Sequence, residues 1–211
     1  LILVIKLKCA IILVVNMSYS NNNNDVKKYI DSYNATSQTV PMVIDRLLTD
    51  LNEMQYPKEE IEEIILSMDE ALTNAIQETI RKEHNLNISY DPEMREITVM
   101  YIVSKDEFEA VIIDHGKGFN FNESIKKTPD KTSFDYFEQI TRYSSEKESG
   151  LHIRVNGQQI SLKGIGAGLK IICAFMDSIN IDLIDKEKIV SDTVSPLTDG
   201  TILTMRRKRR Y

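Results

Sequence analysis

Glu70 and Asn74 are the first residues of this 211-residue chain whose types and spacing indicate chemistry. They stand four positions apart in a stretch with helical periodicity, so their side chains share one face of the predicted helix. A carboxylate and an amide oxygen on one face could hold a magnesium ion and orient a hydroxyl group or a water molecule. An ordinary solvated helix face has the same composition, and this pair alone does not distinguish the two.

A second candidate begins at Asp114, directly after the apolar run 111–113. A carboxylate at the end of a strand can accept a hydrogen bond from an amino group, such as the exocyclic amine of adenine. Gly116 and Gly118 would let the backbone turn sharply and come close to a ligand. A simple turn explains the same residues, so this segment too depends on its context.

A third candidate is the glycine-rich segment formed by Gly164, Gly166 and Gly168, which opens a predicted helix. Glycines before a helix start let backbone N–H groups approach phosphate, where the helix dipole favours negative charge. Lys163 could also meet a phosphate, although a single lysine is more often merely exposed. The segment does not follow a strand of a βαβ unit, so it fails the context of a dinucleotide fingerprint.

Three predicted helices and five predicted strands must position these residues. The first helix follows Pro41, the second follows Pro57 and carries Glu70 and Asn74, and the third follows Gly164. The predicted strands are 86–90, 96–103, 109–113, 178–184 and 201–205. This order predicts an α+β two-layer sandwich with a mixed, largely antiparallel sheet and helices on one face, and it disfavours a Rossmann domain.

Residues 120–163 are polar, and a loop of this length inside a compact domain is usually a functional lid or disordered. Within it, residues 152–155 and 158–162 flank Asn156–Gly157, the strongest short signal of a β-hairpin. A fourth short motif, Gly200–Thr201, leads the last predicted strand and by itself indicates only a turn.

The composition narrows the classes of partner. The net charge of −6 and pI of about 5.2 disfavour a general binder of nucleic acid or anionic membrane. Cys9 and Cys173 form neither a disulfide framework nor a zinc pattern, and they fit a reducing cytoplasm. The basic tail 206–210 could steer an acidic partner or a membrane surface, or it could be the solvated end of the last strand.

The first residues are strongly apolar apart from Lys6 and Lys8. The run 1–15 is shorter than the about 20 residues of a spanning helix, and it lacks the layout of a signal peptide. We interpret it as lying upstream of the true start at Met17, with a membrane anchor as the alternative. Residues 1–24, which end in a run of four asparagines, are therefore predicted to be an extension, and 25–211 a single domain.

Taken in order, the four motifs resemble the N, G1 and G2 boxes of the GHKL ATPase superfamily. They are most similar to the anti-sigma-factor serine kinases, which carry E-A-x-T-N-A, D-x-G-x-G-F, a G-x-G-L/F motif ending in M-D, and a final G-T strand. The resemblance covers residues 39–208. The matching segments are Glu70–Ala75, Asp114–Phe119, Gly166–Leu169 with Met176–Asp177, and Gly200–Thr201.

The resemblance implies a Bergerat-type fold that binds ATP and Mg²⁺ under a long ATP lid. It implies that Asn74 binds the magnesium and that Glu70 is the general base for a serine hydroxyl of a partner. Asp114 would hydrogen-bond adenine, with Thr201 in support. The other nucleotide-binding residues that it implies are Gly116, Gly118, Lys163, Gly164, Gly166, Gly168 and Leu169.

The function that the resemblance implies is a cytoplasmic, homodimeric serine/threonine-protein kinase and anti-sigma factor. It would act by partner switching on a STAS-type anti-sigma antagonist protein and a sigma factor, without contacting nucleic acid or membrane. Three departures from the family pattern leave kinase activity open: Gln77–Glu78 replaces a histidine, the lid is long, and Ile165 and Ala167 are apolar. The alternatives are a nucleotide-dependent binding module and a GHKL ATPase without protein kinase activity.

Overall fold

The computed structural model describes residues 26–86, 96–116, 152–155, 158–159, 167–185, 190–191 and 198–210. Its helices are α2 (Thr39–Glu53), α3 (Lys58–Leu86) and α6 (Ala167–Phe175). Its strands are β1 (Val26–Asn34), β2 (Glu96–Ser104), β3 (Glu107–Asp114), β4 (His152–Val155), β5 (Gln158–Gln159), β6 (Ser178–Asp185), β7 (Val190–Ser191) and β8 (Thr198–Lys208).

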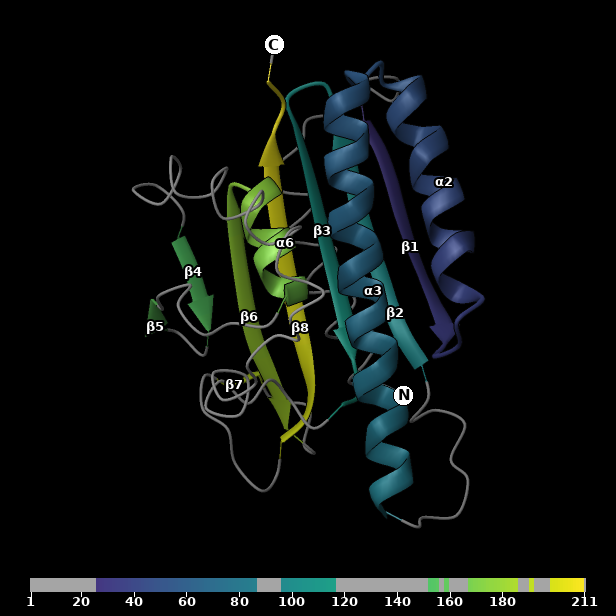
Figure 1. Cartoon of the computed structure of the whole chain (residues 1–211), viewed down its shortest axis with the longest axis vertical. Coiled ribbons are helices and arrows are strands. Elements are labelled where there is room, and N and C mark those ends of the chain that lie inside the picture. Colours follow the sequence, from purple (N-terminus) through teal and green to yellow (C-terminus); the bar gives the residue numbers. More distant parts are fainter. Residues whose placement is uncertain are drawn as a thin grey trace.

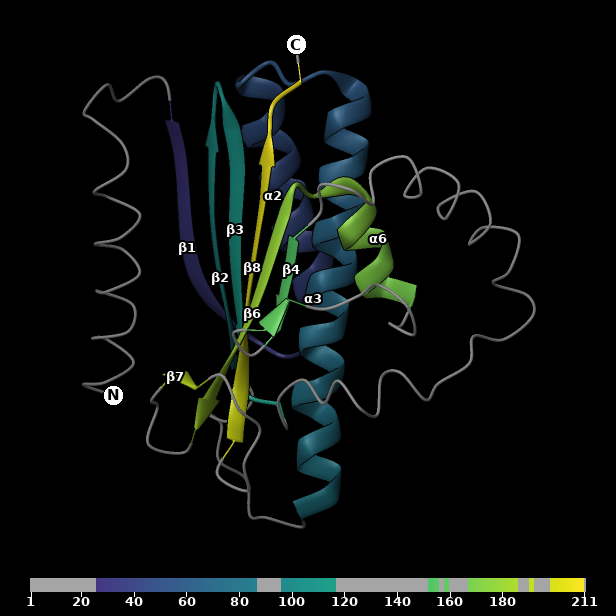
Figure 2. The same ribbon diagram turned by 90° about the vertical axis from the view of Figure 1, so that its left-hand side faces the viewer.

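The described part of the chain forms two layers, a mixed sheet and a layer of helices on one of its faces (Figures 1 and 2). The strand order is β1-β2-β3-β8-β6-β4-β5, and β7 pairs with β6. The pairs from β1 to β6 along this order are antiparallel, whereas β4 pairs with β6 in parallel. The predicted α+β class with a mixed, largely antiparallel sheet is confirmed.

The two N-terminal helices begin close to the prolines that indicated them. Pro41 lies in the first turn of α2, where its missing N–H costs no hydrogen bond. Helix α3 begins directly after Pro57 and continues to Leu86, where the sequence had predicted the start of a strand. The predicted strand 86–90 is wrong at Leu86, because α3 continues beyond the end of its apolar stripe. Residues 87–90 lie outside the described part. No helix among the described residues is long and apolar enough to cross a membrane.

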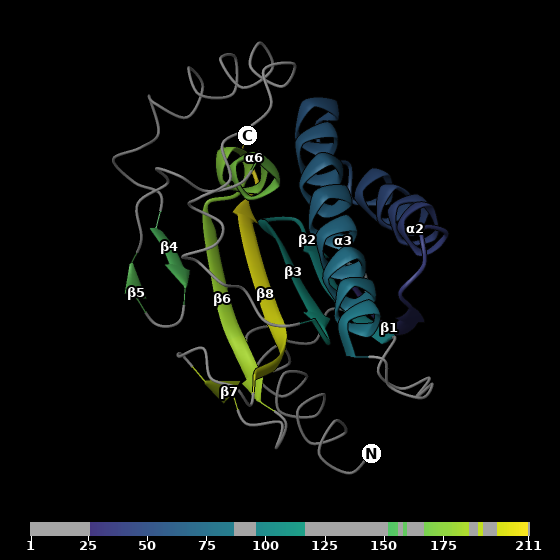
Figure 3. The same ribbon diagram turned by 60° about the horizontal axis from the view of Figure 1, so that its bottom comes forward.

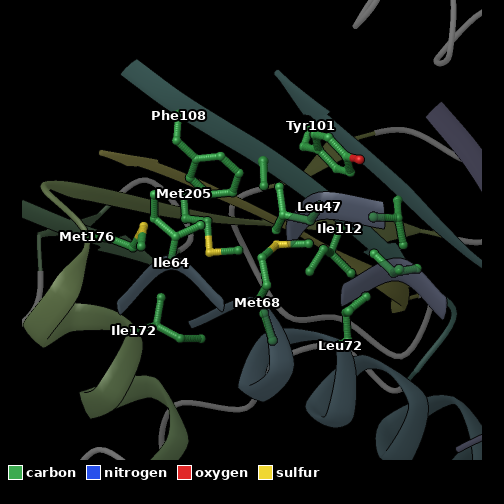
Figure 4. Close-up of a cluster of buried hydrophobic side chains, with 14 of the residues drawn as sticks. Leu47, Ile64, Met68, Leu72, Tyr101, Phe108, Ile112, Ile172, Met176 and Met205 are labelled. Carbon is green, nitrogen blue, oxygen red and sulfur yellow. The ribbon is translucent and has the colours of Figure 1, made fainter. Parts of the chain in front are cut away.

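The main core lies between α3 and the sheet. The apolar stripe of α3 is buried and points at side chains of β3 and β8, which Figure 4 shows in close-up. Residues that meet there include Ile64, Met68 and Leu72 of the helix and Phe108, Ile112 and Met205 of the strands. Because each buried side chain of this kind contributes about 1.5–3 kcal/mol, the stripe sets which face of α3 remains for chemistry.

Strand β1, which the sequence pattern does not predict, forms one edge of the sheet beside β2. Its residues are mostly half-buried or exposed. Its sequence lacks the regular alternation of apolar and polar side chains that indicates a half-buried strand. Side-chain contacts with β2 hold the strand in the sheet. The Tyr29 ring stacks on Tyr101 with centroids 4.9 Å apart, and the hydroxyls of Ser32 and Thr98 are 3.0 Å apart.

The predicted hairpin is present, since β4 and β5 pair in antiparallel fashion through Arg154↔Gln159 and Val155↔Gln158. Strand β4 also pairs with β6, from His152↔Ser178 to Val155↔Ile181. The hairpin that the sequence placed inside the long lid segment therefore belongs to the edge of the sheet.

The basic segment 206–210 forms the end of the last strand: Arg206, Lys208 and Arg210 are exposed, as predicted for a solvated strand end, whereas Arg207 is buried. Strand β8 continues to Lys208. The Arg206 guanidinium donates to Glu109 on the neighbouring strand at 3.0 Å. Arg209 lies over the Tyr56 ring, 4.9 Å from its centroid. These basic side chains make contacts within the fold. A run of charged residues in the sequence does not reveal such contacts.

Arg207 is the most buried of these side chains, with 0% of it exposed. It forms an ion pair with Glu63 of α3, donates to the carbonyl oxygen of Phe175 at 2.9 Å, and places Nε 3.9 Å from Glu60 Oε2. One guanidinium thus joins α3, the end of α6 and β8. Charged groups are buried at this depth only when they are paired, because desolvation otherwise costs several kcal/mol.

We predict that Arg207→Ala lowers the free energy of unfolding by about 3 kcal/mol, because it leaves Glu63 and Glu60 without their buried cation. Urea unfolding followed by circular dichroism measures this. The matched control is Arg206→Ala, which removes an arginine that is 53% exposed and should cost less than about 1 kcal/mol. Equal losses for the two variants would contradict the structural role of Arg207.

Candidate functional site

Three polar residues follow one another along α3 at intervals of one turn. Glu70 and Glu78 are half-buried and Asn74 is exposed, on the side of the helix away from its apolar stripe. The Asn74 amide Nδ2 donates to Glu70 Oε1 at 3.4 Å, a long hydrogen bond within one helix face. The predicted pair is therefore in contact, and the helix presents it as one unit.

The pKa of the Glu70 carboxyl lies above its usual range. Burial is the main cause, and the negative charge of Asp69 adds to it, while the hydrogen bond from Asn74 acts in the opposite direction. A carboxylate with a raised pKa binds a proton more readily at neutral pH, which is the property that general bases need. Raised carboxyl pKa values of this kind are typical of functional sites.

The start of α6 lies directly against Glu70. A Cβ placed on Gly168, the second residue of α6, would be 1.8 Å from Glu70 Oε1. Only a glycine leaves room for the carboxylate at this position. Figure 3 shows α6 and α3 side by side, and Gly168 and Glu70 meet at this contact.

Asp114 ends β3 with its side chain buried, and it faces Thr201 of β8 in the antiparallel register. Its Oδ1 accepts a hydrogen bond of 2.7 Å from the backbone N–H of Gly116. Gly200 packs on the Asp114 backbone, because a Cβ there would be 2.2 Å from the Asp114 carbonyl oxygen. The strand register thus brings two motifs that are far apart in the chain to the same place.

The two halves of the site are joined through Glu78. A Cβ on Gly116 would lie 2.8 Å from Glu78 Cβ and 2.9 Å from Asp114 Oδ1. The turn after β3 therefore rests on α3 one helical turn beyond Asn74, and residues four apart on a helix have Cβ atoms about 5–6 Å apart. Asp114 and Asn74 consequently lie in one region of the molecule.

Sequence reasoning missed Glu78 as a site residue and recorded it only as a departure from the family's histidine. The signal that could have found it is its spacing, since it continues the Glu70–Asn74 face by one more turn. What the spacing does not reveal is its partner, because the contact with Gly116 depends on how β3 meets α3.

The remaining predicted residues divide into two groups. Leu169 is buried in the main core, so its described role is packing. Gly118, Lys163, Gly164 and Gly166 lie outside the described residues, and their roles stay predictions. Across the described ranges, no group of three or more His, Cys, Asp or Glu side chains is arranged to hold a metal ion. A magnesium ion here would need oxygens from a ligand, which matches how proteins bind Mg²⁺ with phosphates.

The sequence matches the histidine kinase-like ATPase domain over residues 33–206. This chain belongs to that family. It is 23% identical over 139 residues, 66% of the chain and 78% of the relative, to the serine-protein kinase RsbW of Bacillus pumilus (strain SAFR-032). The resemblance to GHKL ATPases predicted from the four motifs is confirmed.

A solved structure supports the fold independently. A chain of the SiaB–SiaC complex from Pseudomonas aeruginosa superposes with a TM-score of 0.51 at 12% identity, covering 96% of this chain and 99% of that one. At this identity the likeness establishes the shared α+β architecture, within which the family's motifs take the positions described above.

We predict that Gly168→Ala displaces the Glu70 carboxylate toward solvent without unfolding the protein. The methyl group would meet the flexible end of Glu70, and alanine gains up to about 1 kcal/mol of helix propensity over glycine. Because burial raises the pKa of Glu70, its displacement should lower that pKa toward the usual value, as measured by NMR titration of the carboxyl carbon. Glu62, an exposed residue of the same helix, is the internal control. An unchanged Glu70 pKa would show that Gly168 does not confine this carboxylate.

Proposed function

We propose that this protein is an ATP- and magnesium-dependent serine/threonine-protein kinase that acts as an anti-sigma regulatory factor. The observation that carries the proposal is the joining of Glu70 and Asn74 on α3 to Asp114 and Thr201 through the Gly116–Glu78 contact. These residue types are the ones that the family uses for base, metal and adenine recognition. The family match and the kinase relative support the proposal.

Asp114 would hold the nucleobase. Its carboxylate is buried at a strand end, where an acceptor facing an amino group gains most from a low local dielectric. Its Oδ1 is held by the Gly116 N–H, which orients the carboxylate, and Thr201 stands directly across from it in the register. Asp114 therefore fits as the acceptor for an adenine amine, with the Thr201 hydroxyl in support.

Asn74 would bind the magnesium and Glu70 would act as the general base. The Asn74 Nδ2 donates to Glu70, so its Oδ1 is the oxygen that would face a metal ion. Bound Mg-ATP supplies the phosphoryl group and neutralises much of the charge during its transfer. Glu70 takes the proton from the serine hydroxyl of the partner, and its raised pKa suits it to hold that proton.

The protein substrate would be a STAS-type anti-sigma antagonist, and the regulated partner a sigma factor. In this scheme a homodimer in the cytoplasm captures or releases the sigma factor according to the phosphorylation state of the antagonist. Support comes from the motif set and from the relative's name as a serine-protein kinase.

A second candidate is a nucleotide-dependent binding module that does not transfer phosphate. Glu78 favours it, because the pair Gln77–Glu78 stands where the family often has a histidine, and the Glu78 Cβ lies against Gly116. A negative charge at that position would disfavour the developing negative charge of a transferring phosphoryl group.

We predict that Asp114→Asn weakens binding of Mg-ATP by at least about tenfold, because a hydrogen bond to a charged acceptor is worth about 1.5–3 kcal/mol. Isothermal titration calorimetry measures the affinity. Asparagine keeps the oxygen that accepts from the Gly116 N–H, so the turn should persist. Asp45→Asn, an exposed change on α2, is the control and should bind as the wild type does. Failure of the wild type to bind Mg-ATP would remove both candidate functions.

We predict that Glu70→Gln reduces phosphate transfer to a purified antagonist protein by about 10²–10⁴-fold and leaves Mg-ATP affinity within a few-fold. The assay follows labelled phosphate from ATP to the partner's serine. Glu62→Gln, a change at an exposed glutamate on the same helix, is the matched control. Unaffected transfer in Glu70→Gln would exclude Glu70 as the base, and absence of transfer by the wild type would favour the binding module.

The pH profile of the same reaction tests the same role. The base must be deprotonated, so the rate should rise with pH through the raised pKa of Glu70. Asp69→Asn removes a charge that raises this pKa and should therefore move the acidic limb of the profile to lower pH. A limb that stays in place in Asp69→Asn would indicate that another group titrates.

A further inference from the structure

Thr79 of α3 has a buried hydroxyl group that lacks the usual partner of a helical threonine. Its side chain is 1% exposed, and its Oγ1 has no hydrogen-bond partner in the described part of the chain. Serine and threonine inside helices commonly donate to the backbone carbonyl oxygen four residues earlier. Ser67 of the same helix does so, to Glu63 at 2.9 Å, whereas Thr79 does not. The Thr79 hydroxyl is therefore open to a partner from outside the helix.

A buried hydroxyl without a hydrogen bond destabilises the fold, so its presence needs a reason. The loss of its hydrogen bonds to water is offset only when a partner replaces the water. The other such atoms within the described ranges are Glu60 Oε2 and Arg207 Nε, which lie 3.9 Å apart in an ion pair. Attraction between opposite charges compensates those two atoms, and the neutral Thr79 hydroxyl has no such compensation.

Thr79 belongs to the side of α3 that faces the sheet. It follows Leu72 by seven positions and Ala75 by four, and both of these residues lie in the main core. Residues at this spacing share one face of a helix. Leu72 points from the helix toward the sheet in Figure 4, so the Thr79 side chain projects into the same layer, between α3 and the sheet.

Asp114 and Thr201 project into this layer from the other side. Side chains alternate between the two faces of a strand, and Ile112 of β3 and Leu203 of β8 pack in the main core. Asp114 and Thr201 are each two positions away from one of these residues, so they point to the same face. They stand opposite each other in the register and are 8% and 9% exposed. Deep burial is therefore a property that Thr79 shares with the proposed adenine-binding residues.

Thr79 and Asp114 also lie at the same level along the helix and the strand. Arg207 pairs with Phe108 in the register and forms an ion pair with Glu63, which gives α3 and β3 a common starting point. From Glu63 to Thr79 the helix rises about 24 Å. From Phe108 to Asp114 the strand advances about 20 Å. The two polar side chains therefore stand at the same end of the core.

A contact of Gly116 confirms that the two residues are neighbours. A Cβ on Gly116 would lie 2.9 Å from Asp114 Oδ1 and 3.3 Å from the backbone carbonyl carbon of Glu78. That carbon is bonded to the backbone nitrogen of Thr79. The turn after β3 thus touches the Asp114 carboxylate and the backbone at Thr79 at once.

We propose that the Thr79 hydroxyl is a further nucleobase-binding group, which completes a polar set with Asp114 and Thr201 from three different elements. This inference rests on the proposed function and deepens it. An ionised carboxylate only accepts hydrogen bonds, so Asp114 suits the adenine amine, whereas a hydroxyl both donates and accepts. Thr79 is therefore able to donate to a ring nitrogen of adenine. The bound base supplies the hydrogen bond that the buried hydroxyl lacks.

Thr79→Val tests the assignment in the full chain, because valine keeps the shape of threonine and removes the hydroxyl. Calorimetry should show an affinity for Mg-ATP reduced about threefold to tenfold, as expected for one lost neutral hydrogen bond. Thr79→Ser keeps the hydroxyl and should retain most of the affinity. Ser67→Ala removes a buried hydroxyl that already has its partner, and should bind as the wild type does. Equal affinity of Thr79→Val and the wild type would overturn the proposal.

Urea unfolding without nucleotide distinguishes a ligand-binding hydroxyl from a structural one. The midpoint of Thr79→Val should equal or exceed that of the wild type, because valine removes a buried polar group that has no partner. Ser67→Ala should lower the midpoint, because its hydroxyl is bonded within the helix. A lower midpoint for Thr79→Val would show that the hydroxyl has a partner within the chain, and would overturn the proposal.

These measurements separate the inference from the proposed function. Equal Mg-ATP binding by the wild type and Thr79→Val would remove the role of Thr79 and leave the kinase proposal intact. Failure of the wild type to bind Mg-ATP would remove the nucleotide site itself, and with it both proposals.

Discussion

The position of α3 on the sheet is the constraint on which the rest of this structure depends. Its apolar stripe fixes the rotation of the helix, because Ile64, Met68 and Leu72 are fully buried. The ion pair between Arg207 and Glu63 fixes its translation along β8, since a buried guanidinium must remain opposite its carboxylate. Once these two contacts are made, the remaining turns of α3 have no freedom in where they present their polar side chains.

The same pair of elements sets the spacing of the two halves of the site. Strand β8 contacts α3 through Arg207 near one end and carries Thr201 near the other. Helix α3 carries Glu63 in its second turn and Asn74 about three turns later. The proposed metal ligand Asn74 and the proposed adenine-supporting residue Thr201 are therefore positioned by one helix and one strand that an ion pair joins. Rigid elements of this kind hold site residues in a fixed geometry.

Three glycines let the parts of the candidate site approach each other closely, because glycine has no side chain. Gly168 admits the Glu70 carboxylate, Gly116 admits Glu78, and Gly200 admits the backbone of Asp114. At each position a methyl group would overlap an atom of a neighbouring segment. These three glycines are therefore required by contacts within the fold. The burial that these contacts produce is also the main cause of the raised pKa of Glu70.

The sequence by itself determined the features that depend on local periodicity. The helical face shared by Glu70 and Asn74, the apolar stripe of α3, the strands around Val99 and Ile112, and the fold class all follow from patterns within a few turns or residues. The glycine motifs could also be recognised, because their order along the chain matched a known family.

Only the tertiary structure decided the features that depend on contacts between distant segments. Strand β1 has no clear alternation in its sequence, and the stacking of Tyr29 on Tyr101 helps to hold it beside β2. Glu78 resembles any other polar helix residue in the sequence, and only the structure shows Gly116 packed against it. The basic end of the chain resembled a free tail because the partner of Arg207, Glu63, is 144 positions away. The physical reason is that burial and ion pairing are properties of neighbours in space, which a local pattern of residue types does not specify.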